Sequence, residues 1–170
     1  MRTLLFMLLL IPAISFAQSS QVFIKLTDAD GKQITGDVVI RGFEGQVRAL
    51  TISSSGKNNS QFIFTMPVGS AGGSLKNNMT SGQLLSSVFV FVATGDAMGR
   101  LVPVYTITME QVRVVSCSET MGCNSQLSTG VVLQATRIGW TYYQQDRRGM
   151  STVSQKTGWD STTGQTWTGF

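Results

Sequence analysis

Hydrophobic and polar residues alternate along most of this chain with a period of two, not with the 3.6-residue period of an amphipathic helix. Such alternation is typical of β-strands that bury one face. Turn signals such as Asp30-Gly31 separate the alternating runs, which are short. The pattern predicts strands over residues 22–27, 34–40, 46–53, 61–66, 84–92, 101–109 and 131–143.

Two of these runs depart from simple alternation. The run 84–92 ends in VFVFV, which is apolar on both faces and predicts a central strand. In the following run the apolar positions shift by one residue between Met109 and Val112, and such a shift predicts a β-bulge. The Ser-, Thr- and Gly-rich residues after Gly149 carry only a loop signal. We therefore expect 131–143 to be the last long strand.

One short helix interrupts the predicted strands. Ser74 can cap its beginning, Leu75 and Met79 lie four residues apart on one face, and Gly82 can end it. Many short strands, frequent turn signals and one brief helix predict a mainly β fold, a compact closed barrel or sandwich with one short α-helix.

The first 17 residues have the pattern of a signal peptide. Arg2 supplies the positive charge, Leu4 to Ile11 are apolar, and Ser15 to Ala17 form a small-x-small cleavage site. Eight apolar residues are too few for a permanent membrane span, which needs about 20. We expect cleavage after Ala17, with residues 18–170 left as a single periplasmic or secreted domain; an uncleaved anchor is the alternative.

The charged residues exclude a nucleic-acid footprint. The chain has 13 Lys and Arg and 9 Asp and Glu, for a net charge of +4. The basic residues are scattered singly, and Arg147-Arg148 is the only adjacent pair. A nucleic-acid-binding surface needs a clustered basic stripe, so no nucleic-acid partner is expected.

The two cysteines, Cys117 and Cys123, are candidates for a disulfide. Both lie in the part of the chain expected to be exported, where thiols oxidise. The alternative is two free thiols. A metal site is not expected, because the chain has no histidine and only these two soft ligands.

The absence of histidine also excludes the Ser-His-Asp and Cys-His nucleophile systems. A carboxylate-dependent hydrolase could use Glu44, Glu110 or Asp160, but nothing in the sequence brings two of them together. No cofactor motif is complete: the run from Asp28 lacks the last ligand of a calcium loop, and residues 69–73 lack the Lys of a phosphate loop. We expect no enzyme activity and no cofactor.

Several large aromatic residues crowd the end of the chain. Trp140, Tyr142, Tyr143, Trp159 and Trp167 are expected mainly to pack in the core or between subunits. The alternative is an exported β-sandwich module that uses the three tryptophans to bind glycan or other cell-envelope components.

The order of several segments resembles the Hcp family, the ring-forming tube proteins of the type VI secretion apparatus. The best resemblance is LQATRIGWTYYQQDRRG at 133–149 followed by Gly-Trp-Asp at 158–160. Segments 22–36, 72–92 and 105–118 are similar to the opening strand and turn, the helix with its central strand, and a later strand. The family-signature packing residues are Trp140, Tyr142, Gly158 and Trp159.

The resemblance implies a compact barrel with one helix, assembled into homohexameric rings that stack into a tube. It implies a non-enzymatic structural or carrier protein whose partners are its own copies, secretion-system components or small effector proteins. Strand edges and the loop 54–59 are the expected ring-forming surfaces, because a closed ring needs two different complementary surfaces. Typical members lack a signal peptide, so this chain is expected to be an exported Hcp-like protein.

Overall fold

The computed structural model describes residues 20–54, 61–96, 99–122, 126–146 and 150–170. The predicted signal peptide and residues 55–59 of the predicted loop lie outside these ranges. The elements are β1 (Gln21–Thr27), β2 (Gln33–Ile34), β3 (Val47–Ala49), β4 (Thr51–Ser54), β5 (Gln61–Pro67), α1 (Ser70–Ser81), β6 (Leu85–Gly95), β7 (Leu101–Met121), β8 (Leu127–Gln145), β9 (Ser151–Asp160) and β10 (Gln165–Thr166).

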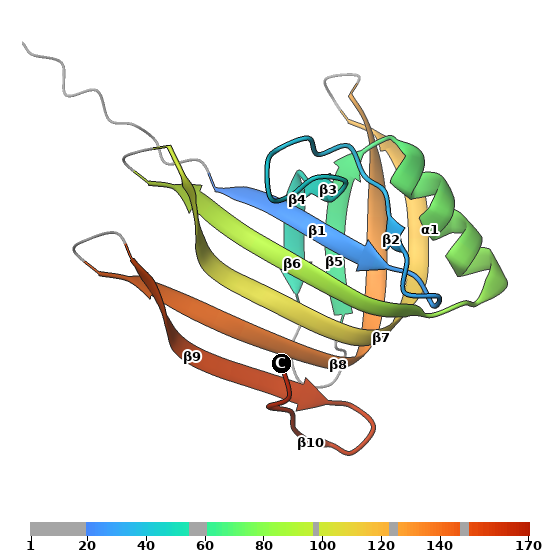
Figure 1. Cartoon of the computed structure of the whole chain (residues 1–170). Helices are drawn as coiled ribbons and strands as arrows, with labels where there is room; N and C mark the ends of the chain where they lie inside the picture. The colour runs from blue at the N-terminus through green and yellow to red at the C-terminus, as the bar shows by residue number, and fades with distance from the viewer. Residues whose placement is uncertain (1–19, 55–60, 97–98, 123–125, 147–149) are drawn as a thin grey trace, which may run out of the picture.

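The strands form one mixed-length antiparallel sheet that does not close on itself (Figure 1). Its path runs β10-β9-β8-β7-β6-β1-β2. Strand β3 pairs with β1 and strand β4 pairs with β5, so this segment lies between β1 and β5, off the main path. At Leu50, between β3 and β4, the N–H donates to the carbonyl of Thr65 at 2.7 Å. The prediction of a mainly β fold with one short helix is confirmed. Of the two predicted arrangements, a closed barrel or a sandwich, the closed barrel is not formed, because the sheet does not close.

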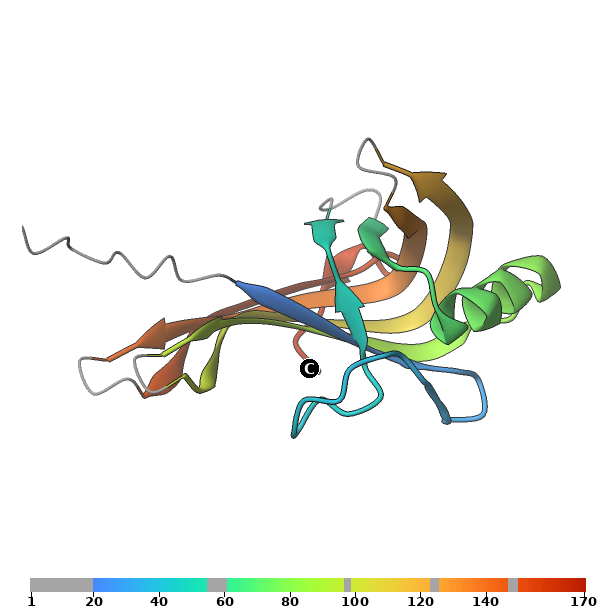
Figure 2. The ribbon, with the colours of Figure 1, turned by 90° about the horizontal axis from the view of Figure 1, so that it is seen from above.

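Strands β7 and β8 are long enough to take part in two layers. The first half of β8 pairs with β5, with Phe62 opposite Leu133, and its second half pairs with β9, with Trp159 opposite Ile138. Figure 2 shows how β7 and β8 run flat beside β6 and β9 and then curl upward beside α1. The core lies between the two layers. Its fully buried members include Ile24, Leu26, Phe62, Phe64, Leu75, Leu85, Val88, Val90, Ile107, Met109, Val131 and Leu133.

On three neighbouring strands, the alternation of buried and exposed residues shifts by one residue at the same level of the sheet. We call the line that joins these three shifts the bend line. Two rows of buried residues flank it, each row in register across β6, β7 and β8. Polar residues separate the rows on every strand. The rows are Leu85, Val112 and Ala135 on one side, and Val88, Met109 and Ile138 on the other.

The predicted shift between Met109 and Val112 is therefore confirmed, but its predicted cause is wrong. The pairing of β7 with β6 and β8 keeps its register there. Gln111 instead has a φ of 48°, in the left-handed region that non-glycine residues seldom adopt. The register shifts in the pairing of β7 lie elsewhere: with β8 between Val114 and Ser116, and with β6 between Val92 and Ala93.

Helix α1 begins earlier than predicted. Gly69, not Ser74, precedes its first turn, and because glycine has no side chain the helix begins without a side-chain cap. Its buried residues are Ala71, Gly72 and Leu75. The small size of Ala71 and Gly72 lets the helix lie close to the sheet, and Leu75 packs in the core. The predicted end is confirmed, since Gly82 has a φ of 69° at the C-cap.

Two strand predictions are wrong. The run 34–40 is a strand only at β2, and the rest is a loop whose turns need positive φ at Gly42 and Gly45. The segment after Gly149 contains β9, ten residues paired along β8. Its Thr, Val and Ser residues suit a strand, and pairing with β8 outweighs the loop signal of the composition.

No helix in the described part of the chain is both long and apolar enough to cross a membrane.

We expect Leu133→Ala to lower the free energy of unfolding by about 2–5 kcal/mol, because it leaves a cavity in the packed core. Leu127→Ala is the matched control on the same strand, since Leu127 is 42% exposed. Its effect should stay within about 0.5 kcal/mol. Urea unfolding followed by circular dichroism measures both. Equal losses in the two variants would contradict the assignment of the core to this face of β8.

Candidate functional site

The signature aromatics Trp140, Tyr142 and Trp159 lie on one face of β8 and β9. Side chains alternate along a strand, so Trp140 and Tyr142 point to the same side as the buried Ile138. Trp159 lies opposite Ile138 in register. Trp140 and Trp159 are partly buried and pack against the core. This face is therefore the core-facing side of the sheet.

Tyr142 extends the aromatic face beyond the core. Its ring lies 6.0 Å from that of Tyr105, its partner in register on β7. Tyr142 is 41% exposed, whereas burial raises the pKa of Tyr105 above its ordinary value. The aromatics thus form a rim at the open end of the core and not an enclosed binding cleft.

Gly158, the fourth signature residue, faces the opposite side of the sheet. It pairs in register with Gly139, a residue that sequence reasoning missed although a glycine inside a strand often marks a close approach. A Cβ on Gly139 would lie 2.5 Å from Cε1 of Phe170, and a Cβ on Gly158 would meet the same atom at 2.5 Å. A side chain at either position would therefore displace the end of the chain, which lies directly on both glycines.

Trp167 lies on this opposite side with Phe170. Its carbonyl oxygen is among the atoms that a Cβ on Gly158 would meet. The centre of its ring lies 4.8 Å from that of Phe170, with the two ring planes tilted by 42°. Trp140 and Trp159 face the core side. The three tryptophans therefore do not form one stacking surface, which counts against the glycan-binding alternative.

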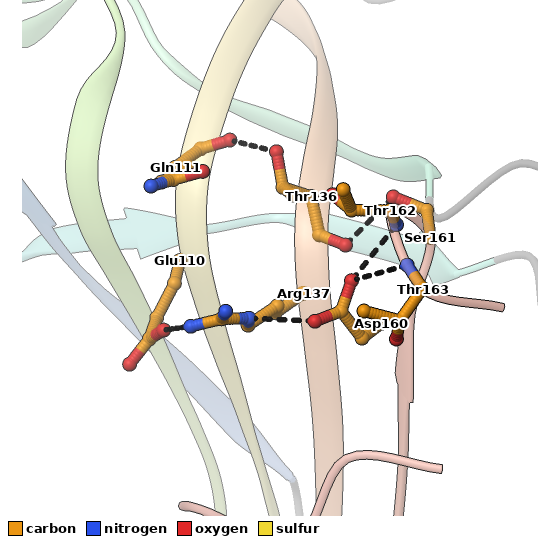
Figure 3. A network of polar contacts seen from close by, with 8 residues as sticks. All are labelled: Glu110, Gln111, Thr136, Arg137, Asp160, Ser161, Thr162 and Thr163. Atoms are coloured by element: carbon orange, nitrogen blue, oxygen red, sulfur yellow. Dashed lines mark hydrogen bonds and ion pairs between the residues drawn. The ribbon is translucent and has the colours of Figure 1, made fainter. Parts of the chain in front are cut away.

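The bend line carries a polar network centred on Arg137 (Figure 3). Its Nε donates to Asp160 at 2.9 Å, and its Nη1 donates to Glu110 at 3.2 Å. The second oxygen of Asp160 accepts the backbone N–H groups of Thr162 at 2.8 Å and Thr163 at 3.2 Å. The network joins β7, β8, β9 and the turn that follows β9.

These contacts leave the two carboxylates poorly suited to hydrolysis. The Arg137 guanidinium holds the pKa of Asp160 below its ordinary value, which disfavours the protonated form that a general acid needs. Arg137 lies between Asp160 and Glu110 and binds both. Glu44 lies apart, in the loop before β3, where it accepts the N–H of Gly42 at 2.8 Å. The structure thus brings two predicted carboxylates together, but as partners of one arginine.

Two of the pockets at the surface of the described chain lie beside helix α1. The larger, about 350 Å³, lies between the helix and the β1–β2 hairpin, and the smaller, about 30 Å³, lies at the start of the helix. Neither is lined by the aromatic rim or by the Arg137 network. The described residues contain no group of three His, Cys, Asp or Glu side chains that could hold a metal ion.

The predicted Cys117–Cys123 disulfide is not formed in this structure. Cys117 is a free, buried thiol, and Cys123 lies outside the described residues. The Sγ of Cys117 lies 3.8 Å from the carbonyl of Gly72, because this side of β7 packs under α1. Burial raises the pKa of the thiol above its ordinary value, which disfavours the thiolate needed for disulfide exchange.

Residues 23–142 match the family model described as type VI secretion system effector, Hcp. The chain belongs to the Hcp family. The match covers the strands from β1 to the second half of β8 and ends at the aromatic rim. No curated protein matches the chain significantly.

Solved structures of Hcp proteins share the fold at low sequence identity. Hcp1 from Salmonella typhimurium superposes with a TM-score of 0.71 at 14% identity, covering 88% of this chain and 99% of that one. Hcp3 from Pseudomonas aeruginosa has a TM-score of 0.61 at 21% identity, and the superposition covers 81% of this chain and 98% of that one. A type VI secretion system effector from Yersinia pestis has a TM-score of 0.65 at 14% identity, and the superposition covers 82% of this chain and 98% of that one.

We expect Asp160→Asn to lower the free energy of unfolding at pH 7, with a difference from the unaltered protein that shrinks as the pH falls below about 4. The folded-state pKa lies below the unfolded value, so the carboxylate stabilises the fold above that unfolded value. This stabilisation is lost as the pH falls through the folded-state pKa. Urea unfolding between pH 7 and pH 2 measures it. A loss that is equal at all pH values would contradict the role of the ion pair.

Proposed function

We propose that this Hcp-family chain is a non-enzymatic structural protein that assembles into hexameric rings and serves as an exported tube or effector-carrier subunit. The family match over residues 23–142 carries this proposal. The fold supports it, because the chain covers nearly the full length of the Hcp structures that it resembles. Its partners would be its own copies, and then secretion-system components or small effectors.

The site geometry supports a role without catalysis. The chain has no histidine, and its candidate carboxylates Glu110 and Asp160 are bound to Arg137. The larger pocket is lined mostly by amide and hydroxyl side chains of α1 and the β1–β2 hairpin. Of its hydroxyl groups, Ser70 donates to the carbonyl of Thr35 and not to a base, whereas a serine nucleophile needs a base beside it.

The open sheet offers the two unlike surfaces that a closed ring requires. At one end, residues 151–157 of β9 pair with β8 on one side, and β10 reaches only Trp159 and Asp160 on the other. At the other end lies β2, which has only two residues. The ends differ in length and sequence, so contact between neighbouring copies would be heterologous. The loop 54–59, also expected as a contact surface, lies outside the described residues except for Ser54.

We expect the mature protein to elute as a hexamer in size-exclusion chromatography with light scattering and to appear as annular particles by negative-stain microscopy. Val153→Glu should shift it toward monomer, because Val153 is 53% exposed on β9 and a charge there would be buried in a ring contact. Val153→Thr is the matched control, since it keeps the side chain's shape and should keep the ring. A protein that stays monomeric at high concentration would contradict the proposal.

The mature form is proposed to be residues 18–170, exported to the periplasm or beyond after cleavage following Ala17. Expression of the full chain followed by cell fractionation should place it outside the cytoplasm. Its amino-terminal sequence should then begin at Gln18, and deletion of residues 1–17 should keep it in the cytoplasm. Unchanged export after that deletion would exclude this route, whatever the oligomeric state.

A further inference from the structure

The last residues of the chain cross the sheet on the face opposite the core, and we call residues 165–170 the strap. Its first two residues form β10, paired with the end of β9. It then passes over Gly158 and Gly139, which lie side by side in register on β9 and β8. We call this pair of glycines the glycine slot. Figure 2 shows the chain end on the side of the sheet away from β4 and β5.

The ring of Phe170 fills the glycine slot. A Cβ on Gly139 would lie within 2.6 Å of three ring atoms, so the ring rests directly on the strand backbone. Gly130, on the same strand β8, shows the contrast: a Cβ there would meet its nearest atom, the carbonyl oxygen of Ser118, at 3.8 Å, an ordinary contact. The slot is therefore shaped for an aromatic ring.

Polar groups beside the slot complete a binding arrangement for a peptide. The N–H of Trp167 donates to the carbonyl of Gly158 at 3.1 Å. The ammonium of Lys156 lies 5.2 Å from the centre of the Phe170 ring and donates to the main-chain oxygen of the same residue. A cation over an aromatic face is attractive, and it favours an aromatic ring over an aliphatic side chain.

The strap is held by docking and not by burial in the core. Gln165, Thr166, Thr168 and Gly169 are exposed, and Trp167 and Phe170 are only partly buried. Neither aromatic belongs to the buried core cluster. Segments with few buried contacts open locally without global unfolding.

We propose that the glycine slot is a binding site for an aromatic residue of an extended peptide, which the strap occupies in cis and can vacate. Recognition comes from three groups: the bare backbone of the slot, the carbonyl of Gly158 as acceptor, and Lys156 as cation and donor. The chain's own strap thus blocks a peptide-binding site. This inference concerns the single protomer and does not depend on ring formation.

The test uses the full chain carrying Trp167→Ala and Phe170→Ala, which removes both aromatic contacts of the strap. A fluorescein-labelled peptide with the sequence of residues 161–170 is the probe, followed by fluorescence anisotropy. We expect saturable binding to this variant and at least tenfold weaker binding to the unaltered protein, whose slot is filled. A probe with alanine in place of its last phenylalanine should bind at least tenfold more weakly.

The matched controls add one methyl group to the doubly substituted protein. Gly158→Ala should abolish binding of the probe, whereas Gly130→Ala should leave it unchanged. Absence of binding to the folded double variant would overturn the proposal. So would equal binding with and without Gly158→Ala, or equal binding to the unaltered protein.

Native-state hydrogen exchange on the unaltered protein keeps the test decisive if the double variant does not fold. The amide of Trp167 should exchange at least tenfold faster than the amides of Ile107 and Leu133 in the central strands. Exchange of Trp167 at the same rate as these core amides would show that the strap leaves only on global unfolding, and would overturn the proposal.

Discussion

Strands β7 and β8 run through both layers of the sheet, and the core exists because they bend together. Leu133 on β8 packs in one layer opposite Phe62, and Ile107 on β7 packs in the other beside Val90. Burial of these apolar side chains is the main stabilising term available to a domain of this size. The bend keeps the apolar side of both strands inside, which is why the buried positions shift by one residue on three neighbouring strands at once. The positions of β9, α1 and the aromatic rim follow from it.

The polar residues on the bend line hold the edge of the sheet in place. Arg137 occupies the interval between two buried rows and reaches both β7 and β9 through Glu110 and Asp160. The backbone of the next turn satisfies the remaining oxygen of Asp160, so this carboxylate serves to fix the end of β9. Two of the three carboxylates that the sequence offered as candidates are thus both bound by Arg137, and this contact fits the proposed role in assembly.

The two faces of the sheet at β8 and β9 carry different groups. The core face carries the aromatic rim of Trp140, Tyr142 and Trp159. Trp140 and Trp159 pack against the hydrophobic core, and Tyr142 is exposed beyond it. The other face carries glycines on adjacent strands, and there the chain's own strap supplies the aromatic cover. Between them runs the outer edge of β9, exposed along residues 152–157 and available to a neighbouring copy in the proposed ring. The proposed recognition therefore depends on strand backbone and aromatic surface, and not on the two pockets beside helix α1.

Alternation of apolar residues determined the strand positions, because a two-residue period follows directly from strand geometry. Gly82 likewise determined the end of the helix, since only a residue tolerant of positive φ suits that position. The order of the segments was enough to indicate the Hcp family. Tertiary structure decided the rest. The Ser- and Thr-rich segment became β9 only because β8 offers it a pairing edge, and the alternation slipped at Met109 through a bend shared by three strands. Likewise, Arg137 joined Glu110 to Asp160, and Phe170 came to lie on Gly139 and Gly158, because strand pairing brings together residues that are far apart in the sequence.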